Sequence, residues 1–454
     1  MSSFPLLSLR SAAVATTAAV LLLAAPLVAL AQDEADTQPV DTTAAAGGVQ
    51  PTQYKPDTYP NTTAGELTPG RGFDLVKTQK GSLNISFYGL FRWINQMPGQ
   101  QTFTDHLGRV RNVKERNDLN WHRSFVWLSG WFWRPEFRYT ISLWSLGTTQ
   151  QSLIFGNLQY RVAPQLNFGV GIGPNMTSRS TQGSWPYWAA TDRQMAEEFF
   201  RGGFSSGAWI SGQALPRLNY IASVNTNLSQ LGTTATNDTR DVATSASLIW
   251  FPTTGEFGPR GGLGDLEYHE QLATRFGVSA CHARESRYAP LDQPPNATQI
   301  RLSDGVNPFE AGALANGVTV NTLDYDYVSV DAGAKLKGFS FQGEAYYRKL
   351  SNFRATGPLP LATNQDQGFM VQAMQMVVPR TLALYATYGY VNDDFHRFPY
   401  EISAGADIYP TKSRVWRLNA HYINIFRCPT GSNFGYYTAG QSGNTVSLGT
   451  DILL

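Results

Sequence analysis

The sequence contains little cysteine and, beyond its first residues, no long hydrophobic run. Only two of the 454 residues are cysteine, which excludes a small scaffold held together by disulfides. After Ala31 no stretch offers the ~18 consecutive apolar residues of a transmembrane helix. Neither sign of charge is in excess, since 35 Lys and Arg face 34 Asp and Glu. Nothing therefore indicates a surface that binds nucleic acid.

The mean hydropathy is −0.25, a value that by itself suggests a soluble protein. In a transmembrane β-barrel, however, apolar residues that face lipid alternate with polar residues that face the lumen, so any window averages to mild polarity. Aromatic residues are plentiful, with 11 Trp, 21 Tyr and 25 Phe. A barrel uses them in girdles at the two membrane interfaces, although a soluble core also accommodates them. Composition alone leaves both classes open.

The first 31 residues have the features of a secretory signal peptide. Arg10 precedes an apolar run that ends in small residues, and we predict cleavage after Ala31 and export through the Sec pathway. A retained membrane anchor is the alternative, but Pro26 and the small-residue end favour cleavage. Residues 32–71 are rich in Thr, Pro, Ala and Gly and lack periodicity, which predicts a disordered periplasmic tail.

From residue 72 to the C-terminus we predict one all-β domain, because short segments alternate between apolar and polar residues. In the segment Phe339–Arg348, FSFQGEAYYR, the residues Phe339, Phe341 and Tyr347 share one face. Period two with one apolar face is the pattern of a strand. About sixteen such strands are predicted, and they begin near Leu83, Asn120, Glu136, Gln151, Gln165, Ser206, Arg217, Val242, Gln271, Tyr325, Phe339, Gly368, Thr381, Tyr400, Arg414 and Asn444.

The lengths of the links between strands distinguish a membrane barrel from a soluble sandwich. Very short links, most built on Pro or Gly, alternate with long polar links, as at Lys337-Gly338 and at residues 175–205. An outer-membrane barrel has tight periplasmic turns and long external loops, and a sandwich has no such requirement. We therefore expect a transmembrane, antiparallel, up-and-down β-barrel in the bacterial outer membrane, in contact with its lipid.

Several segments resemble the phosphate-selective porin O and P family, specifically its broad branch of uncharacterised porins. They are GFDLVKTQKGSLNISFYGLFRWINQ, STQGSWPYWAATDRQMAEEFFR, PTTGEFGPRGGLGDLEYHEQLATRFG and FQGEAYYRKLSNFRATGPLP. The resemblance runs from about Gly72 to the C-terminus and is specific for the branch rather than for a substrate. It implies a homotrimer of sixteen-stranded barrels, each with its own pore narrowed by an infolded third loop.

Charged residues on the polar face of each strand are expected to point into the lumen. A charge on the lipid face costs about 2–4 kcal/mol at the membrane midplane, so the lumen is the more favourable place. Each such residue either tunes selectivity or simply solvates the wall. The predicted pore-lining residues are Arg92, Arg138, Arg161, Arg275, Lys335, Glu344, Arg348 and Arg417, and Asp331, Glu401 and Asp407 are expected to point inward as well.

Residues 175–205 are the candidate constriction loop. The spacing of Thr191 and Gln194 matches a capping box, which predicts that AEEFF continues a short helix. The charged residues that an infolded loop would place opposite the wall are Arg179, Asp192, Arg193, Glu197, Glu198 and Arg201.

No catalytic motif is present, so we expect a channel and not an enzyme. The preferred function is passive diffusion of small hydrophilic solutes with a weak anion preference. The alternatives are a substrate-specific channel, for phosphate or another small anion, and a structural or adhesive barrel with a plugged lumen.

No cofactor and no metal are expected. Asp265, Glu267, His269 and Glu270 in the long link 252–270 suggest a metal site, but a solvated turn is the favoured interpretation because no fixed ligand spacing is present. A disulfide between Cys281 and Cys428 is not expected, because six strands separate them.

Overall fold

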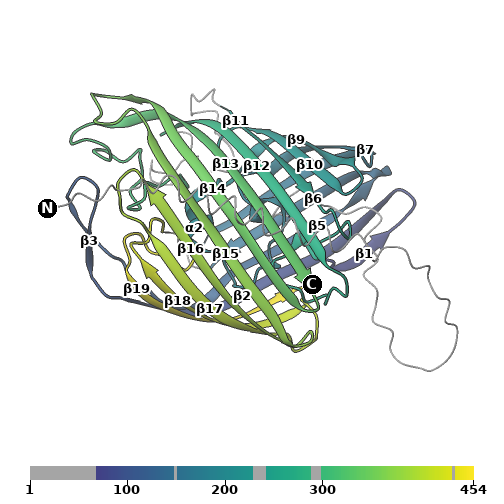
Figure 1. Cartoon of the computed structure of the whole chain (residues 1–454). Helices are drawn as coiled ribbons and strands as arrows, with labels where there is room; N and C mark the ends of the chain where they lie inside the picture. The colour runs from purple at the N-terminus through teal and green to yellow at the C-terminus, as the bar shows by residue number, and fades with distance from the viewer. Residues whose placement is uncertain (1–67, 148–150, 229–241, 288–297, 432–434) are drawn as a thin grey trace. The chain divides into compact units, whose positions relative to one another are not determined.

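Alternating residues form sixteen long strands, and each strand pairs antiparallel with the next. The computed structural model describes residues 68–147, 151–228, 242–287, 298–431 and 435–454, so the predicted signal peptide and nearly all of the predicted tail lie outside it. The strands of the ring are β2 (Gly81–Pro98), β5 (Asn117–Phe132), β6 (Arg134–Leu146), β7 (Gln151–Ala163), β8 (Leu166–Pro174), β9 (Phe204–Leu215), β10 (Leu218–Asn225), β11 (Ala243–Trp250), β12 (Ala273–Ser286), β13 (Val320–Leu336), β14 (Phe339–Ala355), β15 (Asn364–Val378), β16 (Leu382–Asp393), β17 (Tyr400–Ile408), β18 (Trp416–Phe426) and β19 (Gly443–Leu453) (Figure 1). The predicted count of sixteen is confirmed.

The last strand closes the ring on the first. In β19, Val446 pairs with Asn95 of β2 and Leu453 pairs with Tyr88. Where β19 ends, a short strand that the sequence did not predict, β1 (Phe73–Lys77), continues along the same edge of β2. Closure leaves no free edge in the ring, as a lipid environment requires, because lipid offers no hydrogen-bond partner to a backbone group.

Short turns gather at one end of the barrel, the turn end, and longer links at the other, the loop end. The turn between β13 and β14 consists of Lys337 and Gly338, and both have positive φ, 49° and 83°. Two such residues form the tight hairpin turn that matches the twist of paired strands. The exception is the link of residues 251–272 between β11 and β12, which we call the turn insert.

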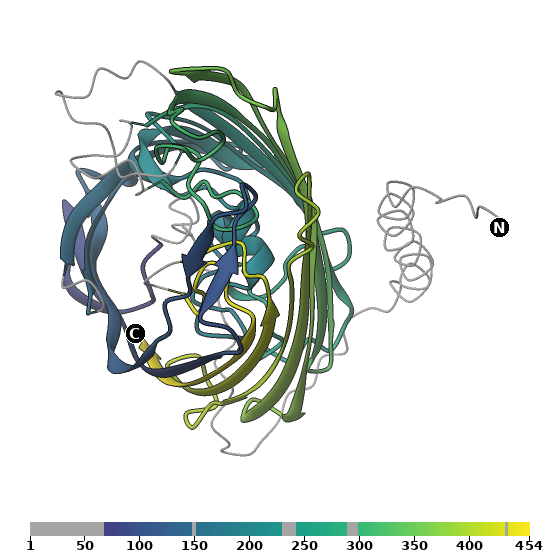
Figure 2. The ribbon, with the colours of Figure 1, turned by 90° about the vertical axis from the view of Figure 1, so that its left-hand side faces the viewer.

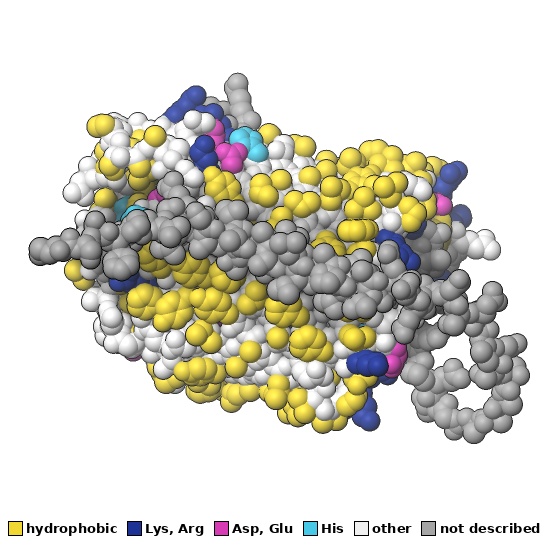
Figure 3. Space-filling model, in the orientation of Figure 1, with side chains coloured by type: hydrophobic (Ala, Val, Ile, Leu, Met, Phe, Trp, Pro, Cys, Tyr) yellow, Lys and Arg dark blue, Asp and Glu magenta, His cyan; other side chains and the backbone are white. Residues whose placement is uncertain are grey.

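The outer surface of the barrel is apolar and its inner surface is polar. Tyr347 and Trp416 are 37% and 40% exposed, whereas Arg348 and Arg417, their neighbours in sequence, point inward and are buried. Hydrophobic side chains cover the strands, and charged side chains gather toward the two ends (Figure 3). Among the described residues no helix is long and apolar enough to cross a membrane.

Two local features depart from simple alternation. A short hairpin, β3 (Thr102–Thr104) with β4 (Val110–Asn112), forms within the link between β2 and β5. In β5 the register shifts opposite Leu90 and Phe91, so that His122 has no directly paired residue on β2. This bulge explains why the segment from Asn120 alternates poorly in the sequence.

A charge placed on the outer face tests this orientation. Val330, an outward residue near the middle of β13, is 39% exposed, and Val330→Arg should cost about 2–4 kcal/mol of folding free energy. Leu336 lies on the same face at the end of β13, and Leu336→Arg should cost about 0–1 kcal/mol. Guanidinium titrations of both variants in lipid vesicles measure the difference. Equal losses would contradict the assigned depth.

Candidate functional site: the barrel interior

The link between β8 and β9, residues 175–203, folds into the barrel, and we call it the inner loop. It contains a single turn of 3-10 helix, η2 (Ser180–Gln182), and the helix α2 (Met195–Phe200). Viewed from the loop end, α2 lies inside the ring of strands (Figure 2). Gln182 of the inner loop donates to Ser279 of β12 at 2.8 Å, and the Arg179 amide donates to Glu344 of β14 at 3.0 Å. The predicted infolded loop is therefore confirmed.

The start of α2 differs from the sequence prediction. Gln194 is the N-cap, with no side-chain cap of its own, and the Thr191 hydroxyl bonds Tyr436 instead of a helix amide. The amide of Met195 donates to the carboxylate of Glu401 on β17 at 2.8 Å. Tyr437 donates to the same carboxylate at 2.6 Å. The predicted capping box is wrong because a carboxylate from the wall supplies the cap.

The six charged residues of the inner loop are all buried, and each is ion-paired or hydrogen-bonded. Asp192 accepts from Arg92 of β2 and from Arg123 of β5. Glu198 binds Arg201 at 2.7 Å, and Arg193 lies 3.8 Å from Glu198. Glu197 accepts from the Ser178 hydroxyl at 3.0 Å, and the Arg179 guanidinium donates to the carbonyl of Gly261 at 2.6 Å. Asp192 thus ties the loop to the wall and Arg179 ties it to the turn insert, whereas the other contacts stabilise the loop's own fold.

All eight predicted pore-lining residues point inward, but six do not reach water. The sequence analysis expected them to line an aqueous lumen. Instead Arg92, Arg275, Lys335, Glu344, Arg348 and Arg417 are each at most 3% exposed. The inner loop and the turn insert cover them, as when Arg348 donates to the Phe199 carbonyl of α2. Arg138 and Arg161 remain partly exposed, because they lie on β6 and β7, away from these contacts.

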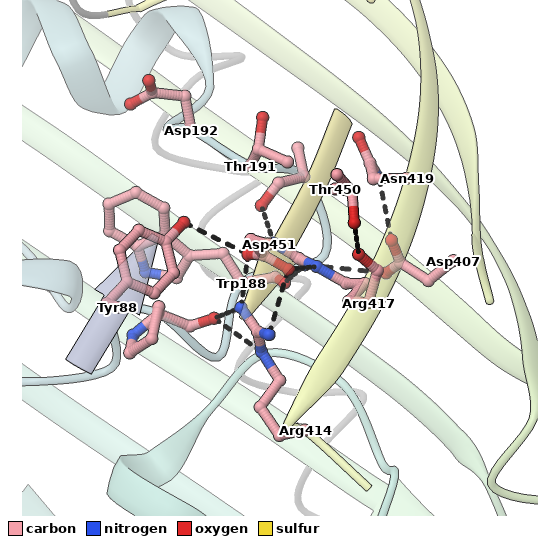
Figure 4. Close-up of polar contacts among 12 residues, drawn as sticks. Tyr88, Trp188, Thr191, Asp192, Asp407, Arg414, Arg417, Asn419, Thr450 and Asp451 are labelled. Carbon is pink, nitrogen blue, oxygen red and sulfur yellow. Dashed lines mark hydrogen bonds and ion pairs between the residues drawn. The ribbon is translucent and has the colours of Figure 1, made fainter. Parts of the chain in front are cut away.

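An aspartate on the last strand anchors the middle of the inner loop to the wall. Asp451 of β19 accepts from Arg414 at 2.7 Å and from Arg417 at 2.9 Å (Figure 4). The two guanidinium groups extend to the inner loop, where Arg414 donates to the Pro186 carbonyl and Arg417 to the Trp188 carbonyl. Asp451 was not singled out from the sequence, although it alternates with the apolar residues of β19. A second aspartate, Asp366 of β15, pairs with Arg348 at 2.7 Å and was also missed.

The turn insert enters the lumen from the turn end. The carbonyl of Leu263 accepts from Ser340 of β14 at 2.9 Å, and the Leu263 amide donates to the Tyr187 carbonyl of the inner loop. Phe257 is 1% exposed. The predicted solvated turn is therefore wrong, because the insert packs between the wall and the inner loop. The glycine-rich sequence of the insert has no hydrophobic periodicity, so its burial could not be predicted.

The ionisable residues of the insert form an ion-pair cluster. The metal-ligating atoms of Asp265, Glu267 and His269 lie within 4.8 Å of one another. Both ring nitrogens of His269 are engaged, however: Nδ1 bonds Asp265, and Nε2 lies 3.0 Å from Glu256. A protonated His269 ring between the carboxylates of Asp265 and Glu256 satisfies these three side chains without a metal ion.

The β3–β4 hairpin lies across the loop end of the barrel (Figure 2). His106 of the hairpin lies 2.8 Å from Asp304, in the link between β12 and β13 on the opposite side of the ring. The His106 ring also stacks on Phe395, and the Thr104 carbonyl accepts from Arg397 at 2.8 Å. The hairpin therefore extends over the mouth and rests on the β12–β13 and β16–β17 links.

Comparisons with known proteins identify the fold. OmpT of Vibrio cholerae, expressed in the outer membrane, is 12% identical, with 84% of this chain and 99% of that chain covered and a TM-score of 0.51. OmpT folded in vitro is 13% identical over the same shares, with a TM-score of 0.51. An anion-selective porin from Comamonas acidovorans is 12% identical over 82% of this chain and 100% of that chain, with a TM-score of 0.48. No protein-family model and no curated protein sequence matches the chain.

The chain has the fold of an outer-membrane β-barrel. The apolar outer surface agrees with this, because it matches a lipid environment and no aqueous one. The barrel fold and its apolar outer surface agree with the predicted location in the outer membrane. At this level of identity the comparison extends to the fold, and function depends on the interior.

Removing the shared carboxylate at Asp451 should release the inner loop. Asp451→Asn leaves Arg414 buried without an anionic partner and leaves Arg417 only Asp407, at 3.8 Å, which should cost about 3–5 kcal/mol. The control is Asp326→Asn, which breaks the exposed pair with His282 on the outer face and should cost less than about 1 kcal/mol. Guanidinium unfolding monitored by tryptophan fluorescence measures both. A loss at Asp451 no larger than at Asp326 would contradict the anchoring role.

The His269 cluster should make the turn insert sensitive to alkaline pH. Partial burial alone would lower the pKa of His269, but hydrogen bonds to Asp265 and Glu256 outweigh it and raise the pKa to about 9. Because the folded pKa is raised, the stabilisation is complete below the ordinary pKa of about 6.5 and is lost as pH rises through about 9. A spin label at Thr254→Cys, with both native cysteines replaced, should gain mobility between pH 8 and pH 10.

The matched control is the same spin-labelled protein with His269→Gln. Since glutamine does not titrate, its label should show no transition in this pH range. A transition that persists in the His269→Gln variant would exclude His269 as its origin.

Proposed function

We propose that the protein is an outer-membrane porin that lets small hydrophilic solutes diffuse passively. The observation that carries this proposal is a closed barrel with an apolar outer face and a polar inner face. The inner face is not fully covered, because Arg138 and Arg161 are partly exposed. The tight turns would face the periplasm and the long loops the exterior. The resemblance to the phosphate-selective porin O and P family supports the proposal and implies a homotrimer.

The weak anion preference is also a proposal. It rests on fewer wall charges than the sequence suggested, because only Arg138 and Arg161 of the eight predicted pore-lining residues are partly exposed. The charges on the partly exposed wall are Arg138 and Arg161 with Glu136, an excess of one positive charge. In the filled part of the lumen, Arg275, Arg348 and Arg417 each bind an aspartate. A guanidinium neutralised in this way offers little to a passing phosphate, which favours general diffusion over a phosphate-specific channel.

A structural barrel with a plugged lumen is the second candidate. The observation in its favour is the burial of six inward charges under the inner loop and the turn insert. An enzyme is the least supported candidate, although the fold itself does not exclude one. His106, His269 and His282 each bond an aspartate within loops or between strands, and these pairs hold structure together rather than activate a nucleophile.

Conductance in a planar bilayer distinguishes the two main candidates. The protein should form ohmic channels with a reversal potential slightly toward that of chloride in a KCl gradient. Arg138→Ala combined with Arg161→Ala should move the reversal potential toward that of potassium, because both charges lie on the partly exposed wall. Lys412→Ala, at an exposed turn outside the lumen, is the control and should change nothing. Correctly folded protein without conductance would favour the plugged barrel.

A further inference from the structure

Charge is distributed unevenly around the inner wall. The strands β8, β9, β10 and β11 contain no charged residue, and on β6 and β7 the inward charges lie near the turn end. Apart from Trp144, Phe155, Trp209 and a few aliphatic residues, the inward side chains of these six strands are mostly hydroxyls and amides, and we call this surface the hydroxyl–amide wall. Representative members are Thr140, Asn157, Gln159, Asn167, Ser211 and Ser223.

Members of the wall bond one another as neutral donors and acceptors. Gln159 donates to Asn157 at 3.1 Å, and Asn167 donates to Gln159 at 3.4 Å. Farther round the ring, the hydroxyls of Ser223 and Ser245 lie 2.8 Å apart. Hydroxyl and amide groups both donate and accept hydrogen bonds, so each can exchange its wall partner for a solute hydroxyl of either role.

The opposite part of the inner wall consists of β12–β19 and β2. Several of its arginines form ion pairs with aspartates of the same wall. Arg275 binds Asp331 at 2.7 Å on this surface, which we call the charged half. The inner loop contacts it at Arg92, Glu344 and Glu401, and the turn insert contacts it at Ser340. The inner loop also bonds β10 and β11 of the hydroxyl–amide wall, at Asn225 and Ser245, and so leaves β6–β9 as the less covered part of that wall. Inward residues of the charged half such as Arg348 are buried. On the hydroxyl–amide wall Gln159 is buried as well, but Asn167 is half-buried and Gln213 is exposed.

At the loop end of the barrel, the mouth of the lumen is covered over the charged half. The β3–β4 hairpin rests on loops that follow β12, β16 and β18, through Asp304, Arg397 and Gly440. Gly440 has to be glycine because an added Cβ would lie 2.0 Å from the Phe103 ring, and its φ is +77°. These contacts place the hairpin over the charged half.

We propose that solutes cross the barrel along the hydroxyl–amide wall, and that the channel favours small neutral hydroxylated molecules, such as sugars and polyols, over ions of similar size. This inference rests on the proposed porin function and adds a path and a substrate class to it. A neutral solute exchanges its hydrogen bonds with water for bonds with the wall. An ion finds no compensating charge along β8–β11 and gives up part of its hydration there.

The experiment combines solute permeation with charge insertion. Swelling of proteoliposomes should be faster in glucose than in either gluconate or glucosamine, which carry opposite charges at similar size. Asn167→Asp places a carboxylate on the wall beside Arg161 and should raise the potassium-to-chloride permeability ratio by about threefold or more. Gln213→Glu, on the same face and exposed, is a second variant in case Asn167→Asp does not fold.

The matched control changes charge in the charged half. Arg348→Met combined with Asp366→Leu removes a buried ion pair while keeping side-chain volume, a replacement that cores often tolerate. It should leave the permeability ratio and the glucose rate unchanged. If the native protein does not conduct, the proposed function fails. If it conducts but the wall variants leave the ratio unchanged, or if gluconate and glucosamine both permeate as fast as glucose, this inference is wrong.

Discussion

The structure depends on one constraint: a backbone group in lipid has no water to bond, so each strand has to be paired on both sides. The pairing of β19 with β2 meets this constraint and closes the ring. Closure in turn fixes the two faces, because successive side chains of a strand point to opposite sides. Apolar residues such as Val330 then face lipid, and every charge within the membrane has to point inward.

The charges that point inward need partners of their own, and the inner loop and the turn insert supply part of them. A charge removed from water needs a partner, and the wall supplies some of these partners itself, as when Asp366 pairs with Arg348. The inner loop supplies others, since Asp192 accepts from Arg92 and the Met195 amide donates to Glu401. The same contacts that satisfy the charges also fill that side of the lumen. The uncharged strands β8–β11 impose no such requirement, which is why the two parts of the wall can serve different purposes.

Much of this architecture could be predicted from the sequence, because the strand signal is local. The alternation around Phe339 and Trp416 gave the orientation of both strands, and the alternation of β19 would have placed Asp451 inside as well. Features that depend on distant partners could not be predicted. The start of α2 depends on Glu401, more than 200 residues away, and the burial of the turn insert depends on Ser340. The glycine-rich insert carries no periodicity that would have revealed that contact.

The central claim is that the two parts of the inner wall differ in access to solutes, and cysteine reactivity tests it most directly. Gln159, Ser223, Gln372 and Thr387 are all uncharged, point inward and are 3–6% exposed, but the first two lie on the hydroxyl–amide wall and the last two on the charged half. Each would be replaced by cysteine in a background without Cys281 and Cys428, and its rate of reaction with a small neutral maleimide measured in vesicles. The account predicts fast reaction at 159 and 223 and slow reaction at 372 and 387. Equal rates, or faster reaction on the charged half, would contradict it.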